Sequence, residues 1–178
     1  MANMAKEKNE LADPDLLFLI AIHNKHIHLD QVLESRGNIL LVIAGLILTF
    51  SLTQIRETFF HNYTLREFGW IIISLSSLLT MFISIFGIKP KLLVKDKNIN
   101  LFYYGDFIQK LSKSEYSAEL AKRLADKETV IESFTEELYT LAKNVLIPGF
   151  RKIILAYDVF LIGLILGFIV LITAFLIG

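Results

Sequence analysis

The sequence predicts an all-α membrane protein with three transmembrane helices, an N-terminal amphipathic helix, and a cytoplasmic helical hairpin between the second and third spans. The chain of 178 residues is 54% hydrophobic and 20% charged, and its mean hydropathy is +0.55. A soluble domain is nearer about 45–50% apolar and about 25% charged. Three apolar runs are each long enough to cross a hydrocarbon core of about 30 Å, which takes about 20 helical residues. This pattern excludes an ordinary soluble enzyme domain.

The apolar runs and the polar segments between them divide the chain into four parts. The first run is Asn38–Ile55, the second is Phe68–Ile88, and the third continues to Gly178. The four expected parts are an N-terminal cytoplasmic segment (1–36), two transmembrane helices with a short outer loop (37–88), a cytoplasmic helical domain (89–152) and the third transmembrane helix (153–178).

Basic residues predict the orientation of these spans. Four Lys or Arg residues precede the first span, two lie in the loop Arg56–Glu67, and twelve lie in Lys89–Lys152. Cytoplasmic loops of membrane proteins carry an excess of such residues. We therefore expect the N-terminus and the central segment in the cytoplasm, and the C-terminus outside.

Helix-start signals place helices in the polar segments. Asp13-Pro14 combines a capping carboxylate with proline at the first helical position. An amphipathic helix should follow toward the first span, because no proline or glycine occurs again before Gly37. Ser112 and Glu115 fit a capping box for a helix that ends near Leu124.

A second helix of the hairpin should begin after Asp126, which can cap it. Its apolar stripe recurs at helical spacing and consists of Val130, Phe134, Leu138, Leu141 and Val145. Pro148-Gly149 then predicts a kink or a short break before the third span, because proline lacks the N–H that a helix interior needs.

A motif in the central segment resembles a known family. The block Asn100–Phe107 reads Asn-Leu-Phe-Tyr-Tyr-Gly-Asp-Phe and is followed by Leu111-Ser112 and Glu115-Tyr116. This pattern resembles the signature of Pycsar-type transmembrane effectors (PycTM). Leu33–Gly37 before the first span, and Ala156–Gly163 in the last, are similar to the corresponding segments of that family. The resemblance extends over about residues 30–175.

The resemblance implies a bacterial antiphage effector in the inner (cell) membrane. A nucleotide signal made during infection by a partner nucleotidyltransferase or cyclase would cause the protein to form a pore or to disrupt the membrane. The family points to a cyclic pyrimidine mononucleotide, whereas related Hailong-type effectors are held shut by oligonucleotides, so the ligand and the sign of its effect stay open. We also expect a homo-oligomer in the lipid bilayer, with a tetramer as the first assumption.

A different class of function remains an alternative. The chain could be a non-conducting membrane anchor or scaffold that recruits a soluble partner through its cytoplasmic helices.

The basic and aromatic residues of the central segment are the candidate nucleotide contacts. Aromatic rings can stack on a base, and lysines can neutralise a phosphate. The candidates are Lys95, Lys97, Phe102, Tyr103 and Tyr104. The alternative is that they belong to the positive flank of the second span and to the aromatic belt at the membrane surface.

Charged residues near the spans are candidates for gating or subunit contacts. Glu34 and Arg36 precede the first span and could pair with Arg151 or Lys152, although exposed pairs contribute only about 0–1 kcal/mol. Asp158 lies inside the third span, where a charge is costly unless it faces water or protein.

Small residues repeat every four positions in two spans and predict close helix packing or a pore lining. They are Ser76, Thr80 and Ser84 in the second span, and Gly163 and Gly167 in the third.

Metal and catalytic sites are not expected. His23, His26 and Asp30 share one helical face, but a structural zinc site normally takes four ligands. The chain has no cysteine, no phosphate-binding glycine loop and no nucleophile elbow. The sequence therefore favours a protein that is not an enzyme and needs no cofactor.

Overall fold

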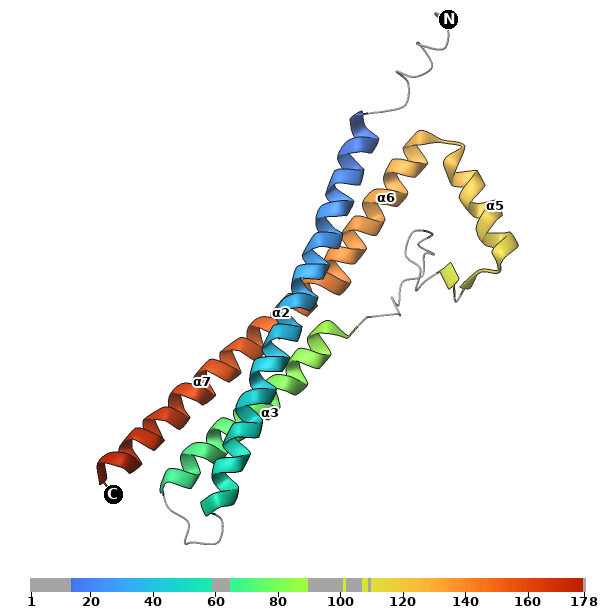
Figure 1. The fold of residues 1–178 in the computed structure, drawn as a ribbon. Helices are drawn as coiled ribbons and strands as arrows, with labels where there is room; N and C mark the ends of the chain where they lie inside the picture. The colour runs from blue at the N-terminus through green and yellow to red at the C-terminus, as the bar shows by residue number, and fades with distance from the viewer. Residues whose placement is uncertain (1–13, 59–64, 90–100, 102–106, 109, 178) are drawn as a thin grey trace, which may run out of the picture. The chain divides into compact units, whose positions relative to one another are not determined.

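The computed structural model describes residues 14–58, 65–89, 101, 107–108 and 110–177 (Figure 1). Every regular element among these residues is a helix, and three helical stretches are long and apolar enough to cross a membrane: Leu17–Arg56, Leu65–Ile88 and Glu128–Ile177. The predicted all-α fold with three membrane helices is confirmed.

The described chain forms six helical elements in two compact units. The elements are α2 (Pro14–Thr58), α3 (Leu65–Ile88), α5 (Lys113–Leu124), α6 (Lys127–Leu141), the π-helical segment η1 (Ala142–Leu146) and α7 (Ile147–Ile177). One unit, here called the polar unit, draws on Met1–Asp30 and Pro90–Ile147. The other, called the membrane unit, draws on Gln31–Lys89 and Pro148–Gly178.

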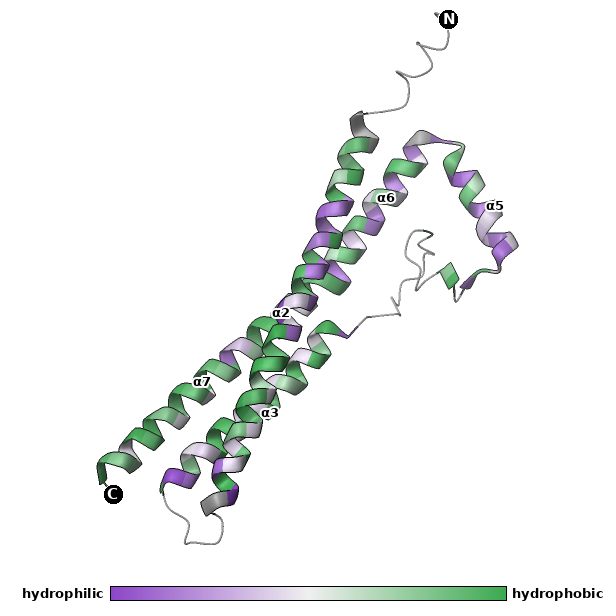
Figure 2. Cartoon of the chain, viewed as in Figure 1, coloured by the Kyte–Doolittle hydropathy of each residue, from purple (hydrophilic) through white to green (hydrophobic). Residues whose placement is uncertain are grey.

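Hydropathy differs between the helices of the two units. Figure 2 shows α3 and α7 as mostly hydrophobic, whereas hydrophilic residues are interspersed along α5 and α6. Helix α2 contributes its N-terminal part to the polar unit and its C-terminal part to the membrane unit without a break in the helix. The predicted N-terminal helix and the first span are therefore one continuous helix.

The membrane unit is held together by close contacts at glycine and small residues. A Cβ added at Gly163 would collide with the Cβ of Ser76, and one added at Gly167 would collide with Ile73. Between α2 and α7, Leu40, Ala44, Ala156 and Phe160 form a buried cluster. Because lipid is as apolar as these side chains, close packing rather than burial from water stabilises such contacts.

The polar unit begins α5 and α6 with the caps that the sequence predicts. The Ser112 hydroxyl accepts from the Glu115 backbone N–H, and Glu115 Oε2 accepts from the Ser112 N–H at 2.8 Å, which completes a capping box. The Asp126 carboxylate accepts from the backbone N–H of Thr129 at 3.2 Å and from its hydroxyl at 2.6 Å. Both helices therefore begin where their orphan amides are satisfied.

The chain before Pro148 is irregular, as the expectation of a kink or short break implies, but the helix does not break there. Helix α7 runs through Pro148, and the wide turn of η1 lies directly before it. The backbone N–H of Ile147 donates to Ala142 O, which is the five-residue step of a π-helix. The wider turn makes room for the proline ring, so the irregularity takes the form of a π-helical segment inside a continuous helix.

The contact between α3 and α7 predicts different outcomes for two glycine substitutions. Gly163→Ala should destabilise the membrane unit by about 1–3 kcal/mol, because the new methyl group forces α3 and α7 apart. Gly45→Ala should be neutral or slightly stabilising, since its Cβ would lie 3.9 Å from Met81 Cε and alanine favours the helix. Thermal unfolding in lipid nanodiscs compares the two variants, and equal midpoints would contradict this packing.

Candidate functional site

The predicted nucleotide contacts lie outside the described residues: Lys95, Lys97, Phe102, Tyr103 and Tyr104. Two residues beside them are described. Leu101 is fully buried, and the ring of Phe107 stacks on Tyr116 of α5 with ring centroids 4.4 Å apart. The stacked ring anchors the C-terminal border of this stretch to α5.

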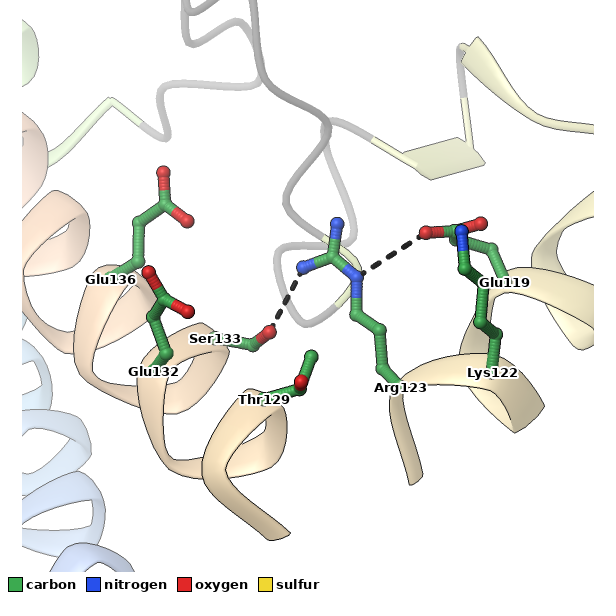
Figure 3. A pocket seen from close by; sticks show the side chains of 7 residues that line it. All are labelled: Glu119, Lys122, Arg123, Thr129, Glu132, Ser133 and Glu136. Carbon is green, nitrogen blue, oxygen red and sulfur yellow. Dashed lines mark hydrogen bonds and ion pairs between the residues drawn. The ribbon is translucent and has the colours of Figure 1, made fainter. Parts of the chain in front are cut away.

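A polar cleft lies between α5 and α6 in the polar unit (Figure 3). Its volume is about 340 Å³, and its lining residues are Glu119, Lys122, Arg123, Thr129, Glu132, Ser133 and Glu136. The guanidinium of Arg123 crosses from α5 toward α6, where Nη1 donates to Ser133 Oγ at 3.0 Å. Arg123 Nε also lies 3.6 Å from Glu119 Oε1. Arg123 therefore joins the two helices across one side of the cleft.

The chemistry of the cleft suits a polar ligand that carries both acceptors and donors. Lys122 and Arg123 can bind an anionic oxygen, while the carboxylates of Glu132 and Glu136 can accept from hydroxyl or amino groups. A nucleotide presents both kinds of group. The three carboxylates outnumber the two cations, so the cleft by itself does not concentrate anions.

Sequence reasoning missed this cleft, although a signal for it was present. Glu132 and Glu136 lie off the apolar stripe of α6 and are four residues apart, which places them on one polar face. Glu119 and Arg123 have the same spacing on α5. Two polar faces on helices joined by a turn as short as Ala125-Asp126 predict a shared polar groove.

Helices α2 and α6 meet in the polar unit through a histidine and an aromatic ring. The rings of His23 and Phe134 lie 5.5 Å apart at 53°. Within the described chain, the Nδ1 atoms of His23 and His26 are buried and have no hydrogen-bond partner. Asp30 is half-buried on the same helix. In the part of the chain that the structure describes, no three or more His, Asp or Glu side chains lie close enough together to hold a metal ion.

Glu137 is a buried acid on α6. It belongs to the polar unit and precedes the apolar helix α7 in the chain. Its side chain is 7% exposed, and its Oε2 has no hydrogen-bond partner among the described residues. Burial raises the pKa of Glu137 to about 7, because a charged carboxylate is disfavoured away from water. This carboxyl group therefore changes its charge near physiological pH.

The structure assigns the small residues of the second span to different neighbours. Ser76 lies against Gly163, and the Thr80 hydroxyl donates to Ala156 O at 3.4 Å, so both face α7. Gly167 lies against Ile73 on the same side. Ser84 is fully buried, but its hydroxyl has no partner in the described chain.

The charged candidates in the membrane unit are not brought together. Glu34 and Arg36 are exposed, and no ion pair among the described residues joins them to Arg151 or Lys152. Lys152 Nζ instead donates to Phe86 O at 3.0 Å. This bond satisfies a carbonyl in the last turn of α3, where a cation also complements the helix dipole.

These features define a multi-pass helical membrane protein whose spans continue into a helical polar unit. Residues 18–177 match the family described as Pycsar effector protein domain, PycTM. The chain belongs to that family, as its central motif predicts, and it is a transmembrane effector of Pycsar antiphage defence. The PycTM domain is not a known enzymatic family. Curated proteins give no match to the chain, and solved structures give none either.

The buried carboxyl group of Glu137 predicts a pH dependence of stability. Its pKa rises from 4.5 when unfolded to about 7 when folded, so the folded state loses stability as the pH rises through that window. The full cost, up to about 3 kcal/mol, is present above pH 7. Glu137→Gln should remove this loss, and thermal unfolding at pH 5 and pH 8 measures it.

The matched control for this prediction is Glu136→Gln, which changes the exposed neighbouring carboxylate. In this control, the difference between the unfolding midpoints at pH 5 and pH 8 should be the same as in the wild type. An unchanged difference in Glu137→Gln would mean that Glu137 stays ionised at both pH values.

Proposed function

We propose that this protein is a nucleotide-responsive effector that assembles as a homo-oligomer in the inner membrane and makes that membrane permeable during phage infection. A partner nucleotidyltransferase or cyclase supplies the nucleotide. Membership of the Pycsar effector family supports this proposal. The three apolar helices supply the membrane body, and the polar unit supplies the surface on which the nucleotide acts.

The observation that carries assembly is the position of Asp158. It is the one acid in the sequence of α7, and it is exposed on the surface of the single chain. Its neighbours on that face are large exposed apolar residues, Ile154, Leu155, Leu161 and Ile162. A charge among lipid-facing side chains costs several kcal/mol by most measures unless protein or water covers it. In the proposed assembly, a second copy of the chain covers Asp158.

The nucleotide acts on the polar unit in this proposal. Lys95, Lys97 and Tyr104 are the predicted contacts for phosphate and base, and the cations Lys122 and Arg123 of the cleft are the described groups with matching chemistry. A ligand shifts an equilibrium between closed and open states only through its different affinity for the two. Bound nucleotide therefore either opens the effector or holds it shut. The direction in which nucleotide changes dye release from proteoliposomes distinguishes the two.

The proposed orientation places the polar unit in the cytoplasm, where the nucleotide is made. The twelve basic residues between Lys89 and Lys152 support it, as does their scarcity between the first two spans. The C-terminus then lies on the outer side.

Assembly through the Asp158 face can be tested by cysteine crosslinking, since the natural chain has no cysteine. In the proposed assembly the Asp158 faces meet around the symmetry axis, where equivalent positions of the copies approach one another. Asp158→Cys should therefore form a disulfide between two copies in oxidised membranes. Phe82→Cys, on an exposed apolar position of α3, is the control and should stay monomeric. Non-reducing gels give the readout, and a monomeric Asp158→Cys would contradict assembly through this face.

Nucleotide control can be tested with proteoliposomes that contain the purified protein and a trapped dye. Cyclic CMP and cyclic UMP should change the rate of dye release, in either direction. Lys95→Ala with Lys97→Ala, or Arg123→Ala, should reduce that response while oligomer size is unchanged. Lys143→Ala removes an exposed cation of the same unit and should leave the response intact.

Two results would contradict the proposal. Dye release that no nucleotide changes would remove the sensing role. Absence of any release, together with stable capture of a soluble partner by the polar unit, would favour the scaffold function instead.

A further inference from the structure

The polar unit and the membrane unit are joined at three points along the chain. These junctions are Asp30/Gln31 within α2, Lys89/Pro90 after α3, and Ile147/Pro148 at the start of α7. A glycine of the membrane unit lies within seven residues of each junction: Gly37, Gly87 and Gly149. A change in the polar unit that reaches the spans through the chain therefore passes close to one of these glycines.

The three glycines belong to one set of contacts, here called the glycine collar. A Cβ added at Gly149 would collide with Leu33 Cδ2 and would lie 3.3 Å from Gly87 O. A Cβ added at Gly37 would lie 3.1 Å from Ile153 Cδ1, and one added at Gly87 would lie 3.0 Å from the same atom. Helices α2, α3 and α7 therefore meet at the collar, and none of its three glycines has room for a larger residue.

The side chains that fill the collar are deeply buried. Leu33 on α2 and Ile153 on α7 are each 2% exposed. Beside them, Lys152 Nζ donates to Phe86 O at 3.0 Å, which joins α7 to the last turn of α3. Closely packed contacts of this kind switch between discrete arrangements and do not deform continuously. The collar is therefore suited to a two-state change.

The other described glycines of these helices make different contacts. Gly163 and Gly167 lie between α3 and α7 alone, and Gly45 faces only Met81 of α3, at 3.9 Å from its Cε. Among the glycines of α2, α3 and α7 that the structure describes, those of the collar are the ones that bring all three helices together. They are also the ones nearest to the junctions with the polar unit.

We propose that the glycine collar is the latch of the effector: Leu33 packed against Gly149 holds α2, α3 and α7 in the closed arrangement, and withdrawal of Leu33 lets the spans separate. The latch rests on the proposed function, in which a nucleotide acts on the polar unit. It adds to that function the contact through which the signal reaches the membrane.

The two sides of the latch continue from helices that touch within the polar unit. There, α2 and α6 meet through the rings of His23 and Phe134. The same α2 carries Leu33 ten residues further on, and α6 leads through η1 into α7, which carries Gly149. A change in the contact between α2 and α6 therefore acts along two helices on the two sides of the Leu33–Gly149 contact. A signal that moves one helix against the other would withdraw Leu33.

A size exchange at the latch tests this contact in proteoliposomes that contain a trapped dye. Gly149→Ala adds a methyl group to a filled site and should shift the closed–open equilibrium toward the open state by roughly 5- to 150-fold, seen as dye release without a signal. Leu33→Ala should also release dye, because it removes the side chain that closes the latch. The two changes together should restore closure, since the methyl group at position 149 fills the space that Leu33 vacates. Gly45→Ala is the control and should behave as the wild type.

A disulfide can lock the same contact, because the natural chain has no cysteine. Leu33→Cys with Gly149→Cys brings two thiols to positions whose side chains would overlap. The oxidised double variant should lose dye release with and without cyclic CMP or cyclic UMP, and reduction should restore it. Mass spectrometry establishes that the bond lies within one chain. Leu33→Cys with Phe82→Cys, a position exposed on α3, is the control on which oxidation should have no effect.

The outcomes separate the latch from the proposed function. A bonded double variant that still releases dye in response to nucleotide would overturn the latch and leave the proposed function standing. A wild type that no nucleotide affects, together with release in Gly149→Ala that Leu33→Ala reverses, would support the latch and contradict nucleotide control. A Gly149→Ala variant that assembles as the wild type does, and releases no more dye than Gly45→Ala, would overturn the latch in either case.

Discussion

Close packing of α3 against α2 and α7 is the contact on which the membrane unit depends. Gly163 and Gly167 let α7 approach Ser76 and Ile73, and Gly37 lets α2 approach Ile88. Apolar burial adds little between helices that are already surrounded by lipid, so shape has to supply the stability. The same close approach fixes which hydroxyls have protein partners and which do not. Helix α3 thus determines both how the membrane unit packs and which of its hydroxyl groups have protein partners.

The polar unit is stabilised by different interactions. Its helices begin at side-chain caps, and Arg123 joins α5 to α6 through Ser133. Hydrogen bonds of this kind are exchanged with water at small net gain, about 1 kcal/mol each. The polar unit also holds the buried carboxyl group of Glu137, whose pKa is raised to about 7, so its stability should depend more on pH than that of the packed spans. That division suits the proposed function, in which a water-soluble nucleotide acts on the polar unit and the effect occurs in the membrane.

The sequence predicts the helices better than it predicts their contacts. Capping at Ser112 and Asp126 and the three spans follow from local rules that each segment obeys on its own. The π-helical segment before Pro148 was not foreseen, because it depends on how the backbone accommodates the proline ring. The cleft between α5 and α6 does not follow from the apolar stripe of α6, because the residues that line it lie on the polar faces of the two helices.

The serine spacing shows how a correct pattern can mislead. A step of four residues advances about 40° beyond a full helical turn, so Ser76, Thr80 and Ser84 drift around α3 and do not form one line. Ser76 and Thr80 meet α7, whereas the buried Ser84 hydroxyl has no hydrogen-bond partner among the described residues. The nucleotide contacts at Lys95–Tyr104 lie outside the described residues and remain a prediction from the motif.

The crossing of α3 and α7 at two glycines has a thermodynamic consequence. A Cβ added at Gly69 would lie 3.1 Å from Gly167 O, and one added at Gly167 would lie 3.1 Å from Gly69 O, so the two backbones touch reciprocally. Separation of this contact exposes it to acyl chains and not to water. The large heat capacity change of soluble unfolding comes from hydration of apolar surface, and here that source is missing. The free energy that holds α3 to α7 should therefore vary almost linearly with temperature, without the maximum and the cold-induced weakening that water gives to soluble domains.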